Sequence, residues 1–134
     1  MKPKYLLDSN ICIYLLRNKY GVVQQVADRG WENCCISEIT VAELLYGAEN
    51  SDSPKQNIQL VTSFCSDIEV LPITNIIPQY AKQKAFLRKK GMLIDDMDVF
   101  IGSTAIGYNC IMVTENVKHL SRLKGIKVEN WVTR

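Results

Sequence analysis

Asp8 is the first residue in this sequence whose surroundings suggest chemistry. It lies in YLLDSNICIYLL at positions 5–16, between an apolar run that ends at Leu7 and a second one that begins at Ile11. Burying a carboxylate without a partner costs several kcal/mol. An acid at the point where a strand is expected to give way to a helix therefore needs other groups around it.

Two further stretches could bring carboxylates to Asp8. Glu43 is the one charged residue in ITVAELLYGA, where the alternative is that it forms the polar edge of a helix. LIDDMDVFIG holds three acids: Asp95 and Asp98 share a helix face, and Asp96, if it is the N-cap, points along the same terminus. Acids at a helix start also favour the helix dipole, but this explains one or two of them better than three.

Clusters of carboxylate oxygens suit hard cations such as Mg²⁺ or Mn²⁺. Such a cation lowers the pKa of a bound water and stabilises charge on a phosphoryl group, so the chemistry would be metal-assisted hydrolysis. Other chemistries lack their residues, since His119 is the single histidine and the sequence has neither a glycine-rich nucleotide loop nor HExxH.

Short apolar runs alternate with helical patterns along the chain. Strands are predicted at 4–7, 34–37, 68–73, 110–114 and 127–131. Helices are predicted at about 9–17, 20–29, 38–50, 54–66, 74–90, 95–109 and 116–123. Continuous apolar strands favour a parallel sheet with helices on both faces, an α/β fold. Ligands bind such sheets beyond the carboxyl ends of the strands, where Asp8 and Thr114 are expected.

The 134 residues are expected to form one domain of ordinary composition, with 47% hydrophobic and 22% charged residues. The five cysteines form no CxxC pair and are odd in number, so we expect reduced, structural thiols. No membrane span or signal-peptide pattern is visible, which predicts a cytoplasmic protein with no membrane partner.

Four motifs, LLDSN, ITVAELLYGAE, LIDDMDVFIGSTA and IMVTEN…ENW, together resemble the VapC-type toxins of the PIN domain family. The resemblance covers nearly the whole chain and implies a single PIN domain over residues 1–134. The implied fold is a PIN-like three-layer α/β/α sandwich with a central, mainly parallel sheet of about four to five strands. The implied function is that of a Mg²⁺- or Mn²⁺-dependent endoribonuclease, the toxin of a type II toxin–antitoxin pair, which cuts RNA and often tRNA. A homodimer and inhibition by a VapB-type antitoxin are implied as well.

By motif, the resemblance implies that Asp8 and Asp98 are metal ligands, that Glu43 is a further catalytic acid and that Asp96 assists. The residues expected beside these acids are Ser9, Asn10, Thr114 and Asn116.

Three residues depart from the family pattern. Asn116 stands where some PIN domains have Asp, and Glu115 beside it is expected to point elsewhere, so a second metal site would be weak. Ser9 replaces the usual Thr and keeps its hydroxyl. Gly102 replaces the usual Ala, with little expected effect.

Net charge is +2, too mild to indicate a nucleic-acid partner by itself. Basic residues that could contact RNA phosphates are Lys82, Arg88, Lys89, Lys90, Lys118 and Arg122. Tyr46 or Tyr108 could stack on unpaired bases. A solvated surface for the charges and core packing for the aromatics are the alternatives.

Two other functions are open at this point. Phosphotransfer through Asp8, as in receiver or haloacid-dehalogenase-like folds, fits poorly because Ser9 and Asn10 follow where further acids are required. The other is a PIN-fold protein that binds RNA or an antitoxin but cuts weakly or not at all, a possibility that Asn116 keeps open.

Overall fold

Five short parallel strands form the centre of the molecule. They are β1 (Tyr5–Leu7), β2 (Cys34–Ser37), β3 (Glu69–Leu71), β4 (Ile111–Val113) and β5 (Val128–Glu129). In the computed structural model, which describes residues 2–134, the strands pair in the order β3-β2-β1-β4-β5. Every pair is parallel, with Leu6 of central β1 beside Cys35 and Met112. The predicted parallel sheet of four to five strands is confirmed.

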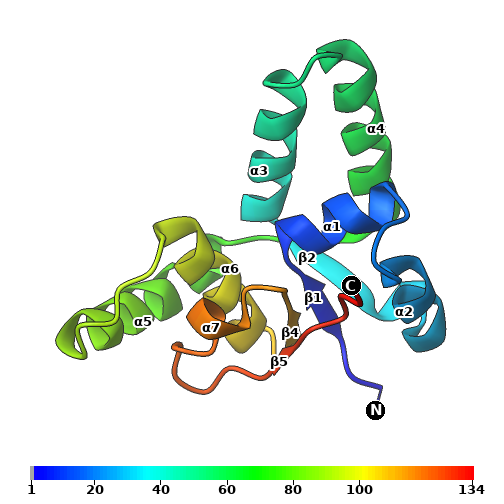
Figure 1. Cartoon of the computed structure of the whole chain (residues 1–134). Helices are drawn as coiled ribbons and strands as arrows, with labels where there is room; N and C mark the ends of the chain where they lie inside the picture. The colour runs from blue at the N-terminus through cyan, green and yellow to red at the C-terminus, as the bar shows by residue number, and fades with distance from the viewer. Residues whose placement is uncertain (1) are drawn as a thin grey trace.

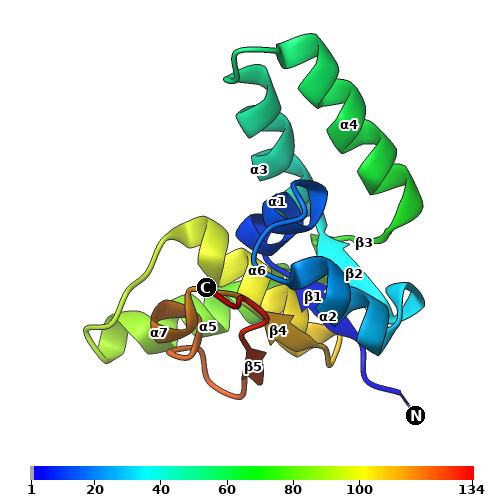
Figure 2. The ribbon, with the colours of Figure 1, turned by 45° about the vertical axis from the view of Figure 1, so that its right-hand side comes forward.

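Helices cover both faces of this sheet. They are α1 (Ser9–Leu16), α2 (Val22–Arg29), α3 (Glu38–Glu49), α4 (Pro54–Asp67), α5 (Ile77–Lys89), α6 (Asp96–Gly107) and α7 (Val117–Leu120), with short 3₁₀ turns at Trp31–Asn33 and Thr74–Ile76. In Figure 1, α1 and α2 lie on one side of the strands and α5 and α6 on the other. Figures 1 and 2 both show α3 and α4 standing out as an antiparallel pair from the end of the sheet at which α1 begins. The predicted three-layer sandwich is confirmed.

The continuous apolar runs arise because both faces of each strand are covered. Leu6 packs into the core beneath α6, with Ile101 and Ala105, whereas its neighbour Leu7 packs into the opposite core, with Ile11. Successive strand residues point to opposite faces, so a strand covered on both sides is apolar throughout.

Acids start two of the helices, and one of them corrects an expectation. Asp8 is the N-cap of α1, and its carboxylate accepts a hydrogen bond from the Ser9 amide at 2.8 Å. Asp95, and not Asp96, is the N-cap of α6, where it accepts from the Met97 amide at 2.9 Å. An acid at the N-cap satisfies an amide that the helix leaves free. Both caps therefore fix carboxylates at helix N-termini.

The other elements follow the sequence closely. Ser37 caps α3 as expected, by accepting from the Ile39 amide at 3.1 Å. The predicted helix at 74–90 is divided into a 3₁₀ turn and α5, and Pro78 lies in the first turn of α5, where a missing amide hydrogen does no harm. All five cysteines are free thiols, four of them buried. No helix within residues 2–134 combines the length and apolarity needed to cross a membrane.

Ile101 anchors α6 to the sheet, and its loss should destabilise the fold. Its side chain is fully buried and lies one turn after Asp98. We expect Ile101→Ala to lower the free energy of unfolding by about 2–5 kcal/mol, because the removed methyl groups leave a cavity. The matched control is Ile77→Ala at the start of α5, where the isoleucine is 50% exposed. This substitution should lower the free energy of unfolding by less than about 1 kcal/mol. Urea denaturation of both variants measures the difference, and equal losses would contradict this packing.

Candidate active site

Asp8 follows the carboxyl end of β1 and is the residue at which α1 begins. Its side chain is only 7% exposed. Oδ1 accepts the Ser9 amide at 2.8 Å, and Oδ2 accepts the hydroxyl of Thr114 at 2.7 Å. Burial raises the pKa of Asp8, and these two hydrogen bonds oppose the rise. The carboxylate that looked misplaced in the sequence is therefore held by its own helix and by the adjacent strand end.

Thr114 links Asp8 to the loop after β4. Its hydroxyl donates to Asp8 and accepts from the backbone N–H of Asn116 at 2.9 Å, while its own amide donates to the Glu129 carbonyl of β5. The hydroxyl is buried, and both of its hydrogen-bonding roles are used. The loop between β4 and α7 thus fixes the rotamer of Asp8. The sequence indicated only that Thr114 lies at a strand end. It did not indicate that its hydroxyl orients Asp8.

Glu43 reaches the same region from the middle of α3. Its Oε1 accepts a hydrogen bond from the Ser9 hydroxyl at 2.5 Å, so Ser9 contacts both acids, one through its amide and one through its side chain. Burial raises the pKa of Glu43, the Ser9 hydrogen bond opposes this, and the charges of Asp8 and Asp95 raise it further. The alternative that Glu43 is simply the solvated edge of α3 is therefore wrong.

Asp98 completes the group of acids from the first turn of α6. Burial raises its pKa to about 6, and the nearby charges of Asp8, Asp95 and Glu43 add to the rise. Neighbouring like charges disfavour the ionised form of one another, and a low dielectric strengthens this effect. Acids from the end of β1, from α3 and from the start of α6 thus lie near one another at the carboxyl end of the sheet, and we call Asp8, Glu43, Asp95 and Asp98 the acid cluster.

Asp96 lies differently from its neighbours in sequence. It forms a salt bridge of 2.9 Å with Lys84 of α5 and accepts a hydrogen bond from Tyr80 at 3.0 Å. These partners lower the pKa of Asp96, the opposite direction from Asp98. Asp95, which sequence reasoning placed on the Asp98 face but did not assign to the site, is the acid whose charge reaches Asp98 and Glu43. The i, i+3 spacing was the signal that could have found it.

The acid cluster has the donors that a hard cation requires. Its candidate ligands are all carboxylate oxygens. Burial and, to a smaller extent, the charges of the neighbouring acids raise the pKa of Asp98, and a bound cation would offset both effects. Within residues 2–134, no three Asp, Glu, His or Cys side chains already stand at the spacing of a shared metal site. Mg²⁺ keeps several waters and is commonly held by one or two carboxylates, so a site built on two acids would not need such a group of three.

The other residues singled out from sequence are placed as follows. Glu115 points away from the cluster, as expected, and binds Tyr14 at 2.9 Å and Arg134 at 2.7 Å. Asn116 contributes its backbone N–H to Thr114. Asn10 is exposed on the first turn of α1. Gly102 lies where an added Cβ would come within 2.6 Å of Leu123, so its small size serves packing against the segment after α7.

The basic residues singled out from the sequence lie on α5 and α7 and in the segments that follow these helices. Lys82, Arg88, Lys89 and Lys90 are exposed along and just after α5, and Lys118 is exposed on α7. Arg122 points its guanidinium at the backbone carbonyls of Met92 and Leu93, at 3.4 and 3.5 Å, in the loop that precedes α6. Contact of these residues with RNA stays a prediction.

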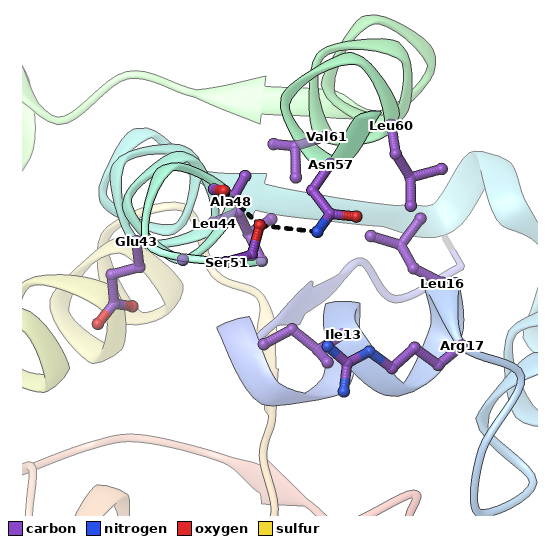
Figure 3. A pocket seen from close by; sticks show the side chains of 11 residues that line it. Ile13, Leu16, Arg17, Glu43, Leu44, Ala48, Ser51, Asn57, Leu60 and Val61 are labelled. Atoms are coloured by element: carbon purple, nitrogen blue, oxygen red, sulfur yellow. Dashed lines mark hydrogen bonds between the residues drawn. The ribbon is translucent and has the colours of Figure 1, made fainter. Parts of the chain in front are cut away.

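Two hollows adjoin the acid cluster, and Glu43 lines both. The first, of about 350 Å³, lies between α1, α3 and the start of α6. The second, of about 160 Å³, is an apolar groove between α1, α3 and α4. In Figure 3, Ile13 and Leu16 form one wall of this groove and Leu60 and Val61 another, while Glu43 points away from it.

Comparisons with known proteins agree with this geometry. The PIN domain family model matches residues 5–126. Ribonuclease VapC2 of Haemophilus influenzae is 35% identical over 133 residues, covering 96% of this chain and 98% of that protein. The tRNA(fMet)-specific endonuclease VapC of Salmonella typhimurium is 34% identical over 129 residues, with 96% and 98% covered. The crystal structure of DNA-bound VapBC from Salmonella typhimurium matches with a TM-score of 0.88 and 34% identity, over 96% of this chain and 98% of that one.

Removing the charge of Asp98 should stabilise the metal-free protein. Burial, together with the charges of neighbouring acids, raises its pKa to about 6 in the folded state. The resulting destabilisation is therefore complete above that pH and disappears as the pH falls below the unfolded value of 3.8. We expect Asp98→Asn to raise the free energy of unfolding in EDTA at pH 7.5 by on the order of 1 kcal/mol, because solvent screens a half-buried group. The gain should vanish near pH 4.

The matched control is Asp96→Asn, which removes an acid whose pKa is lowered by Lys84 and should therefore bring no gain. Urea denaturation at the two pH values measures both variants. A destabilised Asp98→Asn at pH 7.5, or a gain of equal size at both pH values, would contradict the repulsion.

Proposed function

This chain belongs to the PIN domain family, and on that premise we propose that it is a toxin endoribonuclease that cuts RNA with a divalent cation held by Asp8 and Asp98. The nuclease class follows from the family and from relatives named as ribonucleases over nearly the full chain. The Mg²⁺ or Mn²⁺ dependence and the individual roles below are our proposals. The single observation that supports them most directly is that Ser9 joins two of the acids, since its amide donates to Asp8 and its hydroxyl donates to Glu43.

Asp8 and Asp98 would hold the cation, because they are the two acids at the carboxyl end of the sheet that the family motifs assign to it. When bound, the cation would lower the pKa of a water and neutralise charge on the phosphoryl group. Thr114 and the Ser9 amide hold Asp8 in one orientation, which spares the site from ordering this ligand when substrate binds.

Glu43 would accept the proton of the attacking water. The Ser9 hydroxyl engages Oε1, which leaves Oε2 free to receive the proton. A raised pKa makes Glu43 a better base than an ordinary carboxylate, provided it is still ionised at working pH. Water would then attack phosphorus in line, leaving the 5′-phosphate and 3′-hydroxyl ends that the family implies. Asp96, paired with Lys84, would assist by fixing the start of α6 against α5.

An antitoxin of the VapB type is the proposed partner. A VapBC complex from Salmonella typhimurium was solved bound to DNA, and a tRNA is the first substrate to test because a Salmonella relative is named for tRNA(fMet). The groove between α1, α3 and α4 would receive an apolar segment of the antitoxin, since Leu60 stands 49% exposed at its wall. A homodimer, a single domain over 1–134 and a cytoplasmic location stay predictions.

The alternative is a PIN-fold protein that binds RNA or an antitoxin and cuts weakly or not at all. The side chain of Asn116 carries no charge, so it would hold a second cation more weakly than an Asp would. RNA binding in EDTA that is unaltered by added metal, without any cleavage, would favour this alternative.

Asp8→Asn should abolish metal-dependent cleavage. The amide keeps the shape, but its single acceptor oxygen can take the hydrogen bond of either Ser9 or Thr114 and not both, and it loses the charge that would bind the cation. We expect RNA cleavage in Mn²⁺ to fall about 100-fold or more, since a metal contributes several kcal/mol to the transition state. EDTA should abolish the wild-type activity and added Mg²⁺ or Mn²⁺ should restore it.

The control for this experiment is Asp28→Asn, which removes an acid that binds Gln24 on α2, away from the cluster. Gel analysis of labelled tRNA measures all three proteins. Equal cleavage by wild type and Asp8→Asn would end the metal-cluster assignment.

Leu60→Asp should weaken antitoxin binding and spare RNA cleavage by the free toxin. A charge in the apolar groove must be desolvated when a partner segment covers it, so we expect the dissociation constant to rise at least about tenfold. Val23→Asp, on the 41% exposed surface of α2, is the matched control. Calorimetric titration with the antitoxin tests this, and unchanged affinity for Leu60→Asp would place the partner elsewhere.

A further inference from the structure

The larger hollow beside the acid cluster is not used by the proposed chemistry. It measures about 350 Å³ and is lined by Ser9, Asn10, Ile13, Ala42, Glu43, Leu44, Tyr46 and Met97. This volume lies at the lower end of the range of small-molecule sites, about 300–1,000 Å³. Because Ser9 and Glu43 belong both to this wall and to the acid site, a substrate held at the acids must pass directly beside the hollow.

Tyr46 supplies an exposed aromatic ring to this hollow. It lies one turn after Glu43 on α3 and is 70% exposed, a large fraction for an aromatic ring. No side-chain hydrogen bond within residues 2–134 engages its hydroxyl, nor the amide of Asn10 across the hollow. Tyr108, the other aromatic considered for stacking, is occupied, because its hydroxyl donates to the Pro72 carbonyl or to Asn75, at 2.9 and 3.0 Å.

Met97 supplies a second apolar surface from the first turn of α6. It is 41% exposed and follows the N-cap acid Asp95, so it lies beside the acid cluster as well. A thioether is polarisable and packs well against aromatic rings. The hollow therefore offers two exposed apolar surfaces, a ring and a thioether, and one free amide for hydrogen bonding. These groups complement a planar heterocycle, which has apolar faces and a polar edge.

We propose that the hollow walled by Tyr46 and Met97 binds an unpaired nucleobase of the RNA, next to the phosphodiester bond at the acid cluster. The base would stack on the Tyr46 ring, and Asn10 would meet its polar edge. Sequence-selective proteins recognise RNA mainly at such unstacked bases. This inference rests on the proposed ribonuclease function and adds to it a residue that decides which nucleotide is accepted beside the cut.

Three substitutions at position 46 separate stacking from other roles of the side chain. Tyr46→Phe keeps the ring, Tyr46→Leu keeps an apolar side chain without a ring, and Tyr46→Ala removes both. Val23→Ala is the control, since α2 contributes no side chain to this hollow. Thermal melting and gel filtration on every variant report changes in fold or self-association.

The kinetic arm measures cleavage of tRNA in Mn²⁺. Stacking of one base is worth about 1–3 kcal/mol, so KM should rise about 5- to 100-fold in Tyr46→Ala and Tyr46→Leu. Tyr46→Phe and Val23→Ala should stay within about twofold of wild type, and kcat should change little in all four. Unchanged KM in Tyr46→Ala would overturn the proposal, while cleavage by wild type would still uphold the ribonuclease function.

The binding arm uses a single-stranded oligoribonucleotide that carries 2-aminopurine, mixed with the Asp8→Asn chain so that the RNA stays intact. Stacking on Tyr46 should quench the fluorescence, Tyr46→Phe should preserve the quenching, and Tyr46→Leu and Tyr46→Ala should lose it. Equal quenching in all four proteins would overturn the base pocket. Loss of antitoxin binding or a changed oligomeric state in Tyr46→Ala, with unaltered quenching, would assign Tyr46 to a protein interface and overturn it as well. The quenching measurement decides between these outcomes even if wild type cuts no RNA.

Discussion

The constraint on which the candidate site depends is that the fold holds three carboxylates near one another at the carboxyl end of the sheet. Asp8, Glu43 and Asp98 come from a strand end, a mid-helix position and a helix start. The charge of Asp8 raises the pKa of both other acids, and that of Glu43 raises the pKa of Asp98. Such an arrangement costs stability, so the surrounding structure must hold it in place. The parallel sheet does this, because the carboxyl ends of its strands meet at one edge and direct the following helices toward it.

Hydrogen bonds to the acids partly offset the loss of stability that comes from burying them close together. Asp8 is held by an amide of its own helix and by Thr114, and Glu43 by the Ser9 hydroxyl. Asp95 serves as the cap of α6 while its charge acts on the cluster. A metal site needs ligands that are both charged and held in one orientation. An acid at an N-cap is held in one orientation because it accepts a hydrogen bond from a helix amide that would otherwise have no partner. Here the caps that start two helices are thus also part of the candidate site.

Much of this could be read from the sequence, and the limits have physical causes. The continuous apolar strands predicted a covered parallel sheet, and Leu6 and Leu7 show why, since each packs on a different face. The resemblance to PIN domains is likewise confirmed over residues 5–126. The directions of Asp95 and Asp96 could not be read, because adjacent acids at a helix start differ only in which one becomes the cap. Lys84 and Tyr80, which hold Asp96, lie at a sequence distance that no local pattern covers.

The most direct test of the shared acid site is a carboxyl ¹³C NMR titration of the metal-free chain, repeated with Mg²⁺. We predict that Asp98 titrates near pH 6 without metal, well above an ordinary Asp, and that Mg²⁺ lowers its apparent pKa together with that of Asp8. The resonances of Asp96 should not respond in this way. Ordinary titration of Asp98, or side-chain resonances of Asp8 and Asp98 that ignore Mg²⁺, would contradict a common cation site.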